Sequence, residues 1–457
     1  MRSLGIFTVC VSIAAGHLSS VSIAQPFVPP PVIEPDPNQT NSAEADPLQP
    51  QLAAAPDEAG RHGLPPVAAR PETMPEQGIA LEGILDLAIK QNPSLVVARA
   101  RVGESEMRSL ASGLLPNPEV VAGVKEVTGN GSGGVFEITQ ELPVNRSRDY
   151  ERRAARLDYE ADRADLSREI QVILRSVETA YVQVLAAREV SQVERRGMEV
   201  AGDSLALVSE TLKAGLVSSL PYSLALTEFS NAKNSRLLAE KEFQLARQEL
   251  AALLGMEEAS LSPVAGDLHE SLLPPSTVPE NRHDLRAAGL RVQAADSSVA
   301  SARRERIPNP VLGFSREETD TETEEIFSVG IRVPLFNSGK PEVRHRMAAR
   351  QTANSEKAAL ERAVQAERAQ AETRLESKRE AARLYETEIR PSVEKALEAA
   401  SSAFRSGTAD LSLLLQTQTR LIDQERNYVR ALRDLRLAEV EYLLAAGRMG
   451  RLGSSPY

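Results

Sequence analysis

Apolar side chains recur every seven residues along a stretch that contains no proline between Pro143 and Pro221. This period is typical of a long helix that supercoils around a neighbour. At about 1.5 Å per residue, a helix from Arg148 to Leu212 would be on the order of 100 Å long. The stretch therefore predicts either a helix of a packed helical wall or an isolated two-stranded coiled coil. The two apolar rows contain Ile170, Val177, Val184, Ser191, Met198, Leu205 and Leu212, and Ile173, Ala180, Ala187, Glu194, Ala201 and Val208.

The chain repeats this organisation at a spacing of about 192 residues. Repeats of this length indicate duplicated structural units. Each copy predicts a helix, a Pro-Asn-Pro break, two short strands, a long helix, a glycine turn and a returning helix. The first helix, Leu81 to Leu115, is interrupted at Asn92-Pro93, and Pro391 should kink or restart the middle helix of the second copy. The matching segments are Leu115-Pro116-Asn117-Pro118 with Ile307-Pro308-Asn309-Pro310, Lys213-Ala214-Gly215 with Arg405-Ser406-Gly407, and Leu253-Leu254-Gly255 with Ala445-Ala446-Gly447.

The short strands alternate between apolar and polar side chains. Between Glu325 and Leu335, one face has Phe327, Val329, Ile331, Val333 and Leu335, and the other has Ser328, Gly330 and Arg332. In the first copy the pattern is similar: Phe136, Ile138 and Leu142 alternate with Glu137, Thr139 and Glu141. This period of two suits a transmembrane barrel strand, although a half-buried sheet of a soluble protein has the same pattern.

Four strands are too few to close a barrel. An open sheet edge in lipid would leave backbone groups without hydrogen-bond partners. Other chains must therefore complete any sheet that spans a membrane, and three copies would give about twelve strands, within the range of barrels. The sequence thus predicts a pore that several subunits share.

Composition narrows the class of protein. The net charge is −11, and the 457 residues are 26% charged and 4% aromatic. Low aromatic content with much Ala, Leu, Glu and Arg favours long helices over a thick globular core. An acidic balance argues against nucleic acid as a partner, because phosphates need basic surface. It leaves cations as partners, but it is also ordinary for a soluble protein.

The N-terminus predicts export. Arg2 precedes an apolar run from Leu4 to Ala15, and Ser22-Ile23-Ala24 fits a signal-peptidase site. Cys10, the single cysteine, lies inside this segment, so the mature chain would have no disulfide and no lipid anchor. No other apolar run reaches about 18 residues, which excludes a membrane-spanning helix and leaves only strands to cross a membrane.

These boundaries predict five regions. Thirteen of the 28 prolines lie between residues 25 and 78, which indicates an extended tether. The expected order is a signal peptide at 1–24, the tether at 25–78, a first repeat at 79–274 with strands at 118–128 and 135–144, a second repeat at 275–450 with strands at 310–316 and 325–335, and a tail at 451–457.

No motif predicts catalysis or a cofactor. The five histidines have no second histidine or cysteine at ligand spacing, so we expect no dedicated transition-metal site. The glycine-rich segment 129–134 is flanked by strands and fits a hairpin loop better than a phosphate-binding loop. No nucleophile elbow or triad is present, so an enzyme is the least favoured class.

Two kinds of loop remain as candidate sites. The acidic run of Glu317, Glu318, Asp320, Glu322, Glu324 and Glu325 would attract cations to a pore mouth, or it is an ordinary solvated loop. Gly215 and Gly407 each lie between antiparallel helices, where glycine ends a helix. Such tips are either docking points for another helical hairpin or plain turns. The candidate docking residues are Gly215, Leu216, Val217 and Ser218 in the first tip, and Gly407, Thr408, Ala409 and Asp410 in the second.

The repeat, the Pro-Asn-Pro segments, the strand ends at Glu141-Leu142-Pro143 and Arg332-Val333-Pro334, and the glycine tips together resemble the TolC-like outer membrane factor family. The resemblance covers nearly all of residues 79–450. It implies a homotrimer with a twelve-stranded outer-membrane barrel and a periplasmic helical tunnel, without catalysis. The implied partners are outer-membrane lipid, a periplasmic adaptor at the tips and an inner-membrane pump.

Within that family, the segment Leu114-Leu115-Pro116-Asn117-Pro118-Glu119 resembles the branch for heavy-metal cation efflux of the resistance-nodulation-division type. Drug-efflux members have constricting aspartates where this chain has Leu413 and Gln416, so an aspartate gate is not expected and any constriction at these positions would differ. A duct for drugs or for type I protein export is one alternative. The other is a soluble periplasmic coiled-coil scaffold or adaptor.

Overall fold

The computed structural model describes residues 78–126, 132–215, 218–274, 282–319, 322–333, 336, 338–406 and 408–449. All of them belong to one structural unit, Glu72–Tyr457. The predicted signal peptide, residues 25–77 of the predicted tether and the tail at 451–457 lie outside the described residues. The predicted region boundaries therefore stay predictions.

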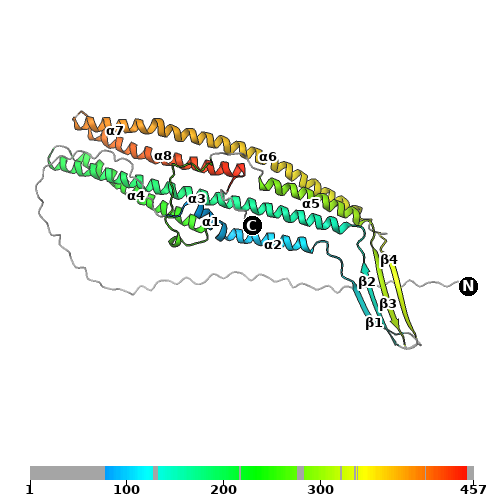
Figure 1. Cartoon of the computed structure of the whole chain (residues 1–457). Helices are drawn as coiled ribbons and strands as arrows, with labels where there is room; N and C mark the ends of the chain where they lie inside the picture. Colours follow the sequence, from blue (N-terminus) through cyan, green and yellow to red (C-terminus); the bar gives the residue numbers. More distant parts are fainter. Residues whose placement is uncertain are drawn as a thin grey trace, which may run out of the picture. The chain divides into compact units, whose positions relative to one another are not determined.

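The described chain is mainly helical, with one small sheet, formed by strands of both halves, at one end of the long helices (Figure 1). This confirms the predicted mainly α class. The first half contains α1 (Leu81–Gln91), α2 (Pro93–Ala111), β1 (Glu119–Glu126), β2 (Ser132–Glu141), α3 (Ser147–Lys213) and α4 (Ser219–Leu253), followed by the 3-10 turn η1 (Glu258–Ser260). The second half contains α5 (His283–Glu305), β3 (Pro310–Glu318), β4 (Thr323–Ile331), α6 (Lys340–Leu384), η2 (Tyr385–Ile389), α7 (Arg390–Arg405) and α8 (Leu411–Ala446).

The helices are irregular at two prolines, with a break before Pro93 and a π-helical turn before Pro391. Asn92 ends α1 in an extended conformation, and its side chain accepts a hydrogen bond from the Ser94 amide to cap α2. In the second half, α6 passes through the π-helical turn η2 into α7, which has Pro391 in its first turn. Proline lacks an amide hydrogen, so it is tolerated at a helix start. The backbone stays helical through this turn, so the middle helix continues past Pro391 with an irregular turn just before it and does not end and restart there.

The 67-residue helix α3 is the element on which the rest of the unit packs. It contacts α1, α2, α4, α5 and α8. Ile170, Val177, Val184 and Ser191 of the predicted seam are buried. At about 1.5 Å per residue α3 is on the order of 100 Å long. It follows strand β2 at one end and carries the first glycine tip at the other (Figure 1).

The main core lies where the two halves meet along α3. Its buried side chains come from α1 and α2 (Ile84, Leu95), from α3 (Leu174, Val177), from the end of α4 (Leu250, Leu254) and from α8 (Leu432, Val440). The segment 261–273, which connects the halves after α4, contributes Leu261, Val264 and Leu268 to the same core. We call this segment the connector. Ile79 pairs with it through two backbone hydrogen bonds, to Pro263 and from Ala265, of 2.8 and 3.0 Å.

The sheet joins the two halves in the order β1-β2-β3-β4, with every neighbouring pair antiparallel. The pairing of β2 with β3 connects the first hairpin to the second, for example through Ile138 opposite Phe314. Direct partners across a sheet share a face. The register therefore brings the apolar residues of both halves to one side.

Candidate functional site

One face of the sheet is an exposed apolar surface. A central row across all four strands contains Val120, Ile138, Phe314 and Phe327. Phe314 and Phe327 pack with their ring centroids 5.0 Å apart. On β4, Phe327 is 81% exposed and Val329 is 76% exposed. A contiguous apolar patch of this kind marks a surface for lipid or another protein.

The opposite face is more polar. Its rows contain Glu119, Thr139, Gly313 and Ser328, and Glu137 beside Ser315, although Val121 and Ile326 also lie on this side. An added Cβ at Gly313 would lie 2.5 Å from the Ser328 hydroxyl oxygen, so a larger residue there would require the serine side chain to move. The predicted alternation thus holds across strands from both halves: the central rows of one face are mainly apolar and those of the other face are more polar.

The outer edges of the sheet are open. Within the described residues, β1 pairs only with β2, and β4 pairs only with β3. An exposed edge presents unpaired amide and carbonyl groups that another strand can bind. The sheet can therefore be extended at both edges by strands from other chains.

Charged groups gather at the end of the β3–β4 hairpin. Arg316 forms ion pairs with Glu318 at 3.4 Å and with Glu325 at 3.7 Å, and all three side chains are about half exposed or more. Glu322 and Glu324 are exposed as well, while Asp320 lies outside the described residues. The acidic run is thus partly balanced by Arg316, and its predicted role in cation attraction stays a prediction.

Two asparagines join the halves where the sheet meets the helices. The Asn309 side-chain amide donates to Glu141 at 2.8 Å, and its oxygen accepts from the Asn145 amide at 3.2 Å. The Asn145 side chain donates to the Ile307 carbonyl and accepts from the Ser147 amide that begins α3. From the sequence, the second Pro-Asn-Pro segment is predicted as a helix break that matches the first copy, with no contact assigned to its asparagine. The structure shows that its asparagine holds the first strand pair to the second.

The first tip follows the end of α3. Gly215 has a φ of +73°, the left-handed region that glycine adopts without strain. A Cβ added there would meet nothing within 4 Å, so the tip is open on that side. Ser218 precedes α4 in an extended conformation and is exposed. The candidate docking residues Leu216 and Val217 lie outside the described residues.

The second tip connects α7 to α8. Its central residue, Gly407, lies outside the described residues. The amides of Thr408 and Ala409 both donate to the Ala403 carbonyl, at 2.9 and 3.2 Å, and close the end of α7. Asp410 precedes α8 without a side-chain capping hydrogen bond. The structure thus places Thr408, Ala409 and Asp410 in a short turn, and a docking role stays a prediction.

The candidate constriction residues lie one turn apart near the start of α8. Both Leu413 and Gln416 are exposed in the single chain, with Leu413 at 49%. The neighbouring Leu414 and Leu415 are buried. Helix α8 therefore presents Leu413 and Gln416 away from its own core, and no aspartate stands at either position.

Side chains from two helices hold the backbone of the connector. From α3, Tyr181 donates to the Ala265 carbonyl at 2.9 Å, and Arg188 donates to the carbonyls of Val264 and Gly266 at 2.9 and 2.6 Å. From α8, Arg436 donates to the carbonyls of Leu268 and His269 at 3.0 and 3.1 Å. Five successive or near-successive carbonyls are thus satisfied by side chains, which fixes a segment that has no regular structure.

The Arg436 side chain is itself held by a buried carboxylate. Arg436 and Glu439 are 6% and 2% exposed, and Arg436 Nη1 donates to both oxygens of Glu439 at 2.6 and 2.7 Å. Glu439 also accepts from the Ser271 hydroxyl and from the Leu272 amide, both at 2.9 Å. Such a pair is stable only when its remaining hydrogen bonds are made, and here they are made by the connector.

A second charged cluster joins α5 to α6. Arg282 donates to Asp284 at 2.7 Å and to Glu367 at 2.6 Å. Burial disfavours the charged form of Arg282, but the hydrogen bonds to Asp284 and Glu367 outweigh it and raise its pKa. Burial likewise would raise the pKa of Asp284, and the bonds from Arg282 outweigh it and lower that pKa. The cluster is a structural link between helices.

Among the described helices, none has a segment long and apolar enough to span a bilayer. The architecture is a twofold repeat of long helices that carries one sheet with an apolar face.

The chain belongs to the family described as "Outer membrane efflux protein", which it matches over residues 84–256 and 275–448. The two matches correspond to the two halves and confirm the predicted tandem repeat. Membership in this family confirms the resemblance drawn from the sequence and the expected location in the outer membrane, with an extension into the periplasm. Family members are channel proteins rather than enzymes, and the alternative of a soluble periplasmic scaffold is thereby removed.

Two relatives show how broad the family is. The chain is 23% identical over 394 residues to the cobalt-zinc-cadmium resistance protein CzcC of Cupriavidus metallidurans, a match that covers 84% of this chain and 93% of CzcC. It is 24% identical over 315 residues to the pyoverdine export outer membrane protein OpmQ of Pseudomonas putida, covering 60% of this chain and 67% of OpmQ.

A solved structure has the same fold. The chain superposes on a structure of CusC, described in terms of folding and transmembrane channel formation, with a TM-score of 0.70 and 16% identity. The match covers 84% of this chain and 99% of CusC. At this identity the comparison concerns the fold alone.

Proposed function

We propose that this chain is one of three identical subunits of a passive exit duct in a tripartite efflux system. The observation that supports it most is the sheet: four strands, an exposed apolar face and two open edges. Four strands cannot satisfy their backbone in lipid, because each open edge leaves amides and carbonyls unpaired. Pairing β4 of one subunit with β1 of the next would remove all edges, and three subunits would form about twelve strands.

The helices would continue the duct into the periplasm. Helix α3 is on the order of 100 Å long and leads away from the sheet. Three copies of the α3–α4 and α7–α8 pairs would form a helical tunnel below the sheet. Transport through it would need no catalysis by this chain, because an inner-membrane pump of the resistance-nodulation-division type would supply the driving force.

The two tips would bind a periplasmic adaptor. Gly215 and Ser218 of the first tip, and Thr408, Ala409 and Asp410 of the second, follow or precede helix ends at exposed turns. Hairpin tips suit end-to-end contact with another helical hairpin, since their backbone polar groups are accessible. Leu216, Val217 and Gly407 complete the proposed docking set. Leu413 and Gln416, within the first two turns of α8, would line the periplasmic constriction.

We propose heavy-metal cations as the transported class. The match to a cobalt-zinc-cadmium resistance protein covers nearly the whole length of that relative. The segment Leu114 to Glu119 supports the same branch. A duct for another solute is the second candidate, because the match to a pyoverdine export protein is similar in identity although shorter.

Growth assays separate these substrates. A deletion strain would be challenged with Co²⁺, Zn²⁺, Cd²⁺, Cu²⁺ and Ag⁺, and in parallel with hydrophobic drugs. We expect the deletion to sensitise cells to one or more cations and not to the drugs, with recovery on complementation. Sensitivity to drugs alone would contradict the cation assignment and keep the duct.

A charge placed at a tip tests the docking surface. Gly407→Asp should impair the resistance conferred by complementation while the trimer persists in detergent gels, because the added carboxylate would have to be desolvated when a partner covers the tip. Ser262→Asp adds the same charge at an exposed connector position and should leave resistance unchanged. Full resistance with Gly407→Asp would refute the docking assignment without affecting the duct itself.

A further inference from the structure

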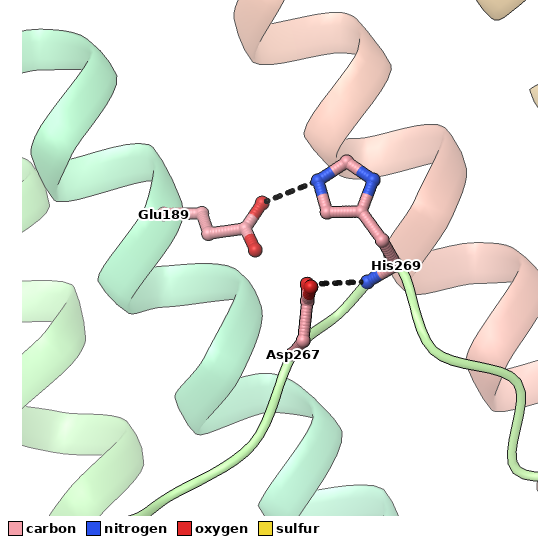
Figure 2. A group of neighbouring side chains, drawn as sticks. All are labelled: Glu189, Asp267 and His269. Carbon is pink, nitrogen blue, oxygen red and sulfur yellow. Dashed lines mark hydrogen bonds and ion pairs between the residues drawn. The ribbon is translucent and has the colours of Figure 1, made fainter. Parts of the chain in front are cut away.

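Three side chains with metal-binding atoms converge between α3 and the connector. Each of Glu189, Asp267 and His269 offers one ligand atom, and these atoms all lie within 4.8 Å of one another. Figure 2 shows Glu189 on α3, with Asp267 and His269 on the connector that passes in front of it. Sequence analysis assigned no metal ligand here, because the two elements are about 80 residues apart along the chain and only folding brings them together.

The distances suit a small divalent cation. The Nε2 atom of His269 lies 3.8 Å from the Glu189 carboxylate. Two ligands that each lie about 2.1 Å from one ion can be at most about 4.2 Å apart, and a tetrahedral ion places them closer. Two tetrahedral ligands at about 2.1 Å lie roughly 3.4 Å apart, so the Glu189–His269 pair would close by about 0.4 Å. The other pairs of ligand atoms, which lie within 4.8 Å, would close by at most about 1.4 Å, which side-chain rotation can provide.

The backbone that carries two of the ligands is fixed. Asp267 accepts a hydrogen bond from the His269 amide at 2.9 Å, which forms a tight turn with both side chains on it (Figure 2). Arg188 and Arg436 hold the carbonyls on both sides of this turn, those of Gly266 and of Leu268 and His269. The position of the imidazole relative to α3 is therefore set before any ion arrives, which lowers the entropic cost of binding.

The local charge favours a cation. Glu189 and Asp267 bring two negative charges and Arg188 brings one positive charge. Two further carboxylates, those of Glu82 and Glu270, lie in the same region: like Asp267, each raises the pKa of Tyr181 through its negative charge. Glu189 and His269 are partly exposed, with side chains at 19% and 29%, so an ion can enter without opening the core.

We propose that Glu189, Asp267 and His269 form an exchangeable site for a divalent transition-metal cation of the Zn²⁺ or Co²⁺ class. One imidazole nitrogen and two carboxylate oxygens are a donor set of intermediate hardness, suited to Zn²⁺, Co²⁺ or Ni²⁺ rather than to Ca²⁺, which needs six or more oxygens. Three protein ligands leave positions for water, which suits exchange more than permanent retention. A bound ion ties the connector to α3.

Zinc titration of the full-length mature protein in detergent tests the proposal. Isothermal calorimetry with ZnCl₂ should give one saturable Zn²⁺ per chain. Asp267→Asn keeps an oxygen for the His269 amide and removes only the charge, so the turn should persist while Zn²⁺ affinity falls at least about tenfold, or 1.4 kcal/mol. Glu189→Gln and His269→Gln should each lower the affinity at least as much.

His345→Gln is the matched control. His345 is an exposed histidine on α6 that does not belong to the cluster, so its removal should leave the affinity unchanged. Substituted Co²⁺ gives a second readout, a visible absorption band that His269→Gln should alter. The proposal is wrong if no saturable site is found, or if the cluster variants bind Zn²⁺ as tightly as the wild type. The metal site and the proposed transport of cations are tested separately, because calorimetry measures Zn²⁺ binding to this site and growth assays measure transport.

Discussion

The Glu439 carboxylate should be among the most sensitive single groups in the connector region. It is 2% exposed and accepts hydrogen bonds from Arg436, Ser271 and Leu272. Glu439→Gln keeps the shape of the side chain but replaces one oxygen with an amide that donates. The new NH₂ group can take the place of either carboxylate oxygen. In both orientations it faces the Arg436 guanidinium, and in addition it faces either the Ser271 hydroxyl or the Leu272 amide.

The expected cost is large because the variant leaves a buried charge uncompensated. Arg436 would keep the carbonyls of Leu268 and His269 and the one amide oxygen of the substituted side chain, none of which carries a negative charge. Breaking a buried ion pair by removing one partner costs about 3 to 5 kcal/mol. At about 1.4 kcal/mol for each factor of ten, the connector should open at least about a hundredfold more often.

Hydrogen exchange measures this opening directly. In the detergent-solubilised protein, the amides of residues 268–273 should exchange at least about a hundredfold faster in the variant than in the wild type, while those of the α3 centre change little. Glu394→Gln is the same chemical change in an exposed pair with Arg390, whose side chains are 48% and 47% exposed, and should cost less than about 1 kcal/mol. Equal exchange in the Glu439 variant and the control would refute the reasoning that the pair holds the connector.

Three further changes test other parts of the structure. Gly266→Ala should loosen the connector, because the residue has a φ of +139° and a Cβ there would lie 1.9 Å from the Tyr181 hydroxyl oxygen. The control is Gly289→Ala on α5, where an added Cβ meets no described atom within 4 Å. In denaturant titration this control should leave the free energy of unfolding unchanged or raise it by about 0.5 to 1 kcal/mol. Burial raises the pKa of Tyr181 to about 12, so its contribution to stability should be complete below about pH 10 and be lost as the pH rises toward 12. Ultraviolet titration of the wild type should show one tyrosine that ionises late, and this step should be missing in Tyr181→Phe. A Tyr181 that ionises near pH 10 would contradict the burial. Phe327→Lys places a charge on the apolar face of the sheet and should cost about 2 to 4 kcal/mol in lipid, which would lower the amount of protein in the outer-membrane fraction. Glu137→Gln on the opposite face should not lower it. Equal amounts of both variants would refute a lipid-facing role.

The long helices and the repeat could be predicted because their signals are local and periodic. The seven-residue spacing of Ile170, Val177 and Val184 depends only on the helix that contains them, and the structure buries all three. The alternation around Phe327 and Val329 predicted the apolar side of β4 in the same way. The order of strands and the face shared by both halves needed the register, which no single strand specifies.

The connector could not be predicted, because its contacts join residues that are far apart in the sequence. In the sequence, no pattern separates these residues from the other polar residues of their helices: Tyr181, Arg188, Arg436 and Glu439. Only the fold shows that these side chains hold carbonyls of the connector. Two weak signals of the connector are present in the sequence. One is Gly266 in a short segment between helices, and the other is the pair of charged residues, Arg436 and Glu439, on the side of α8 that the structure buries.

The mass of the detergent-solubilised mature protein tests the central claim most directly. Light scattering corrected for bound detergent should give the mass of three chains, because a four-stranded sheet with two open edges and an apolar face requires neighbouring strands to be stable in lipid. A particle of one chain that stays soluble without detergent would contradict both the shared wall and the exit duct built from it.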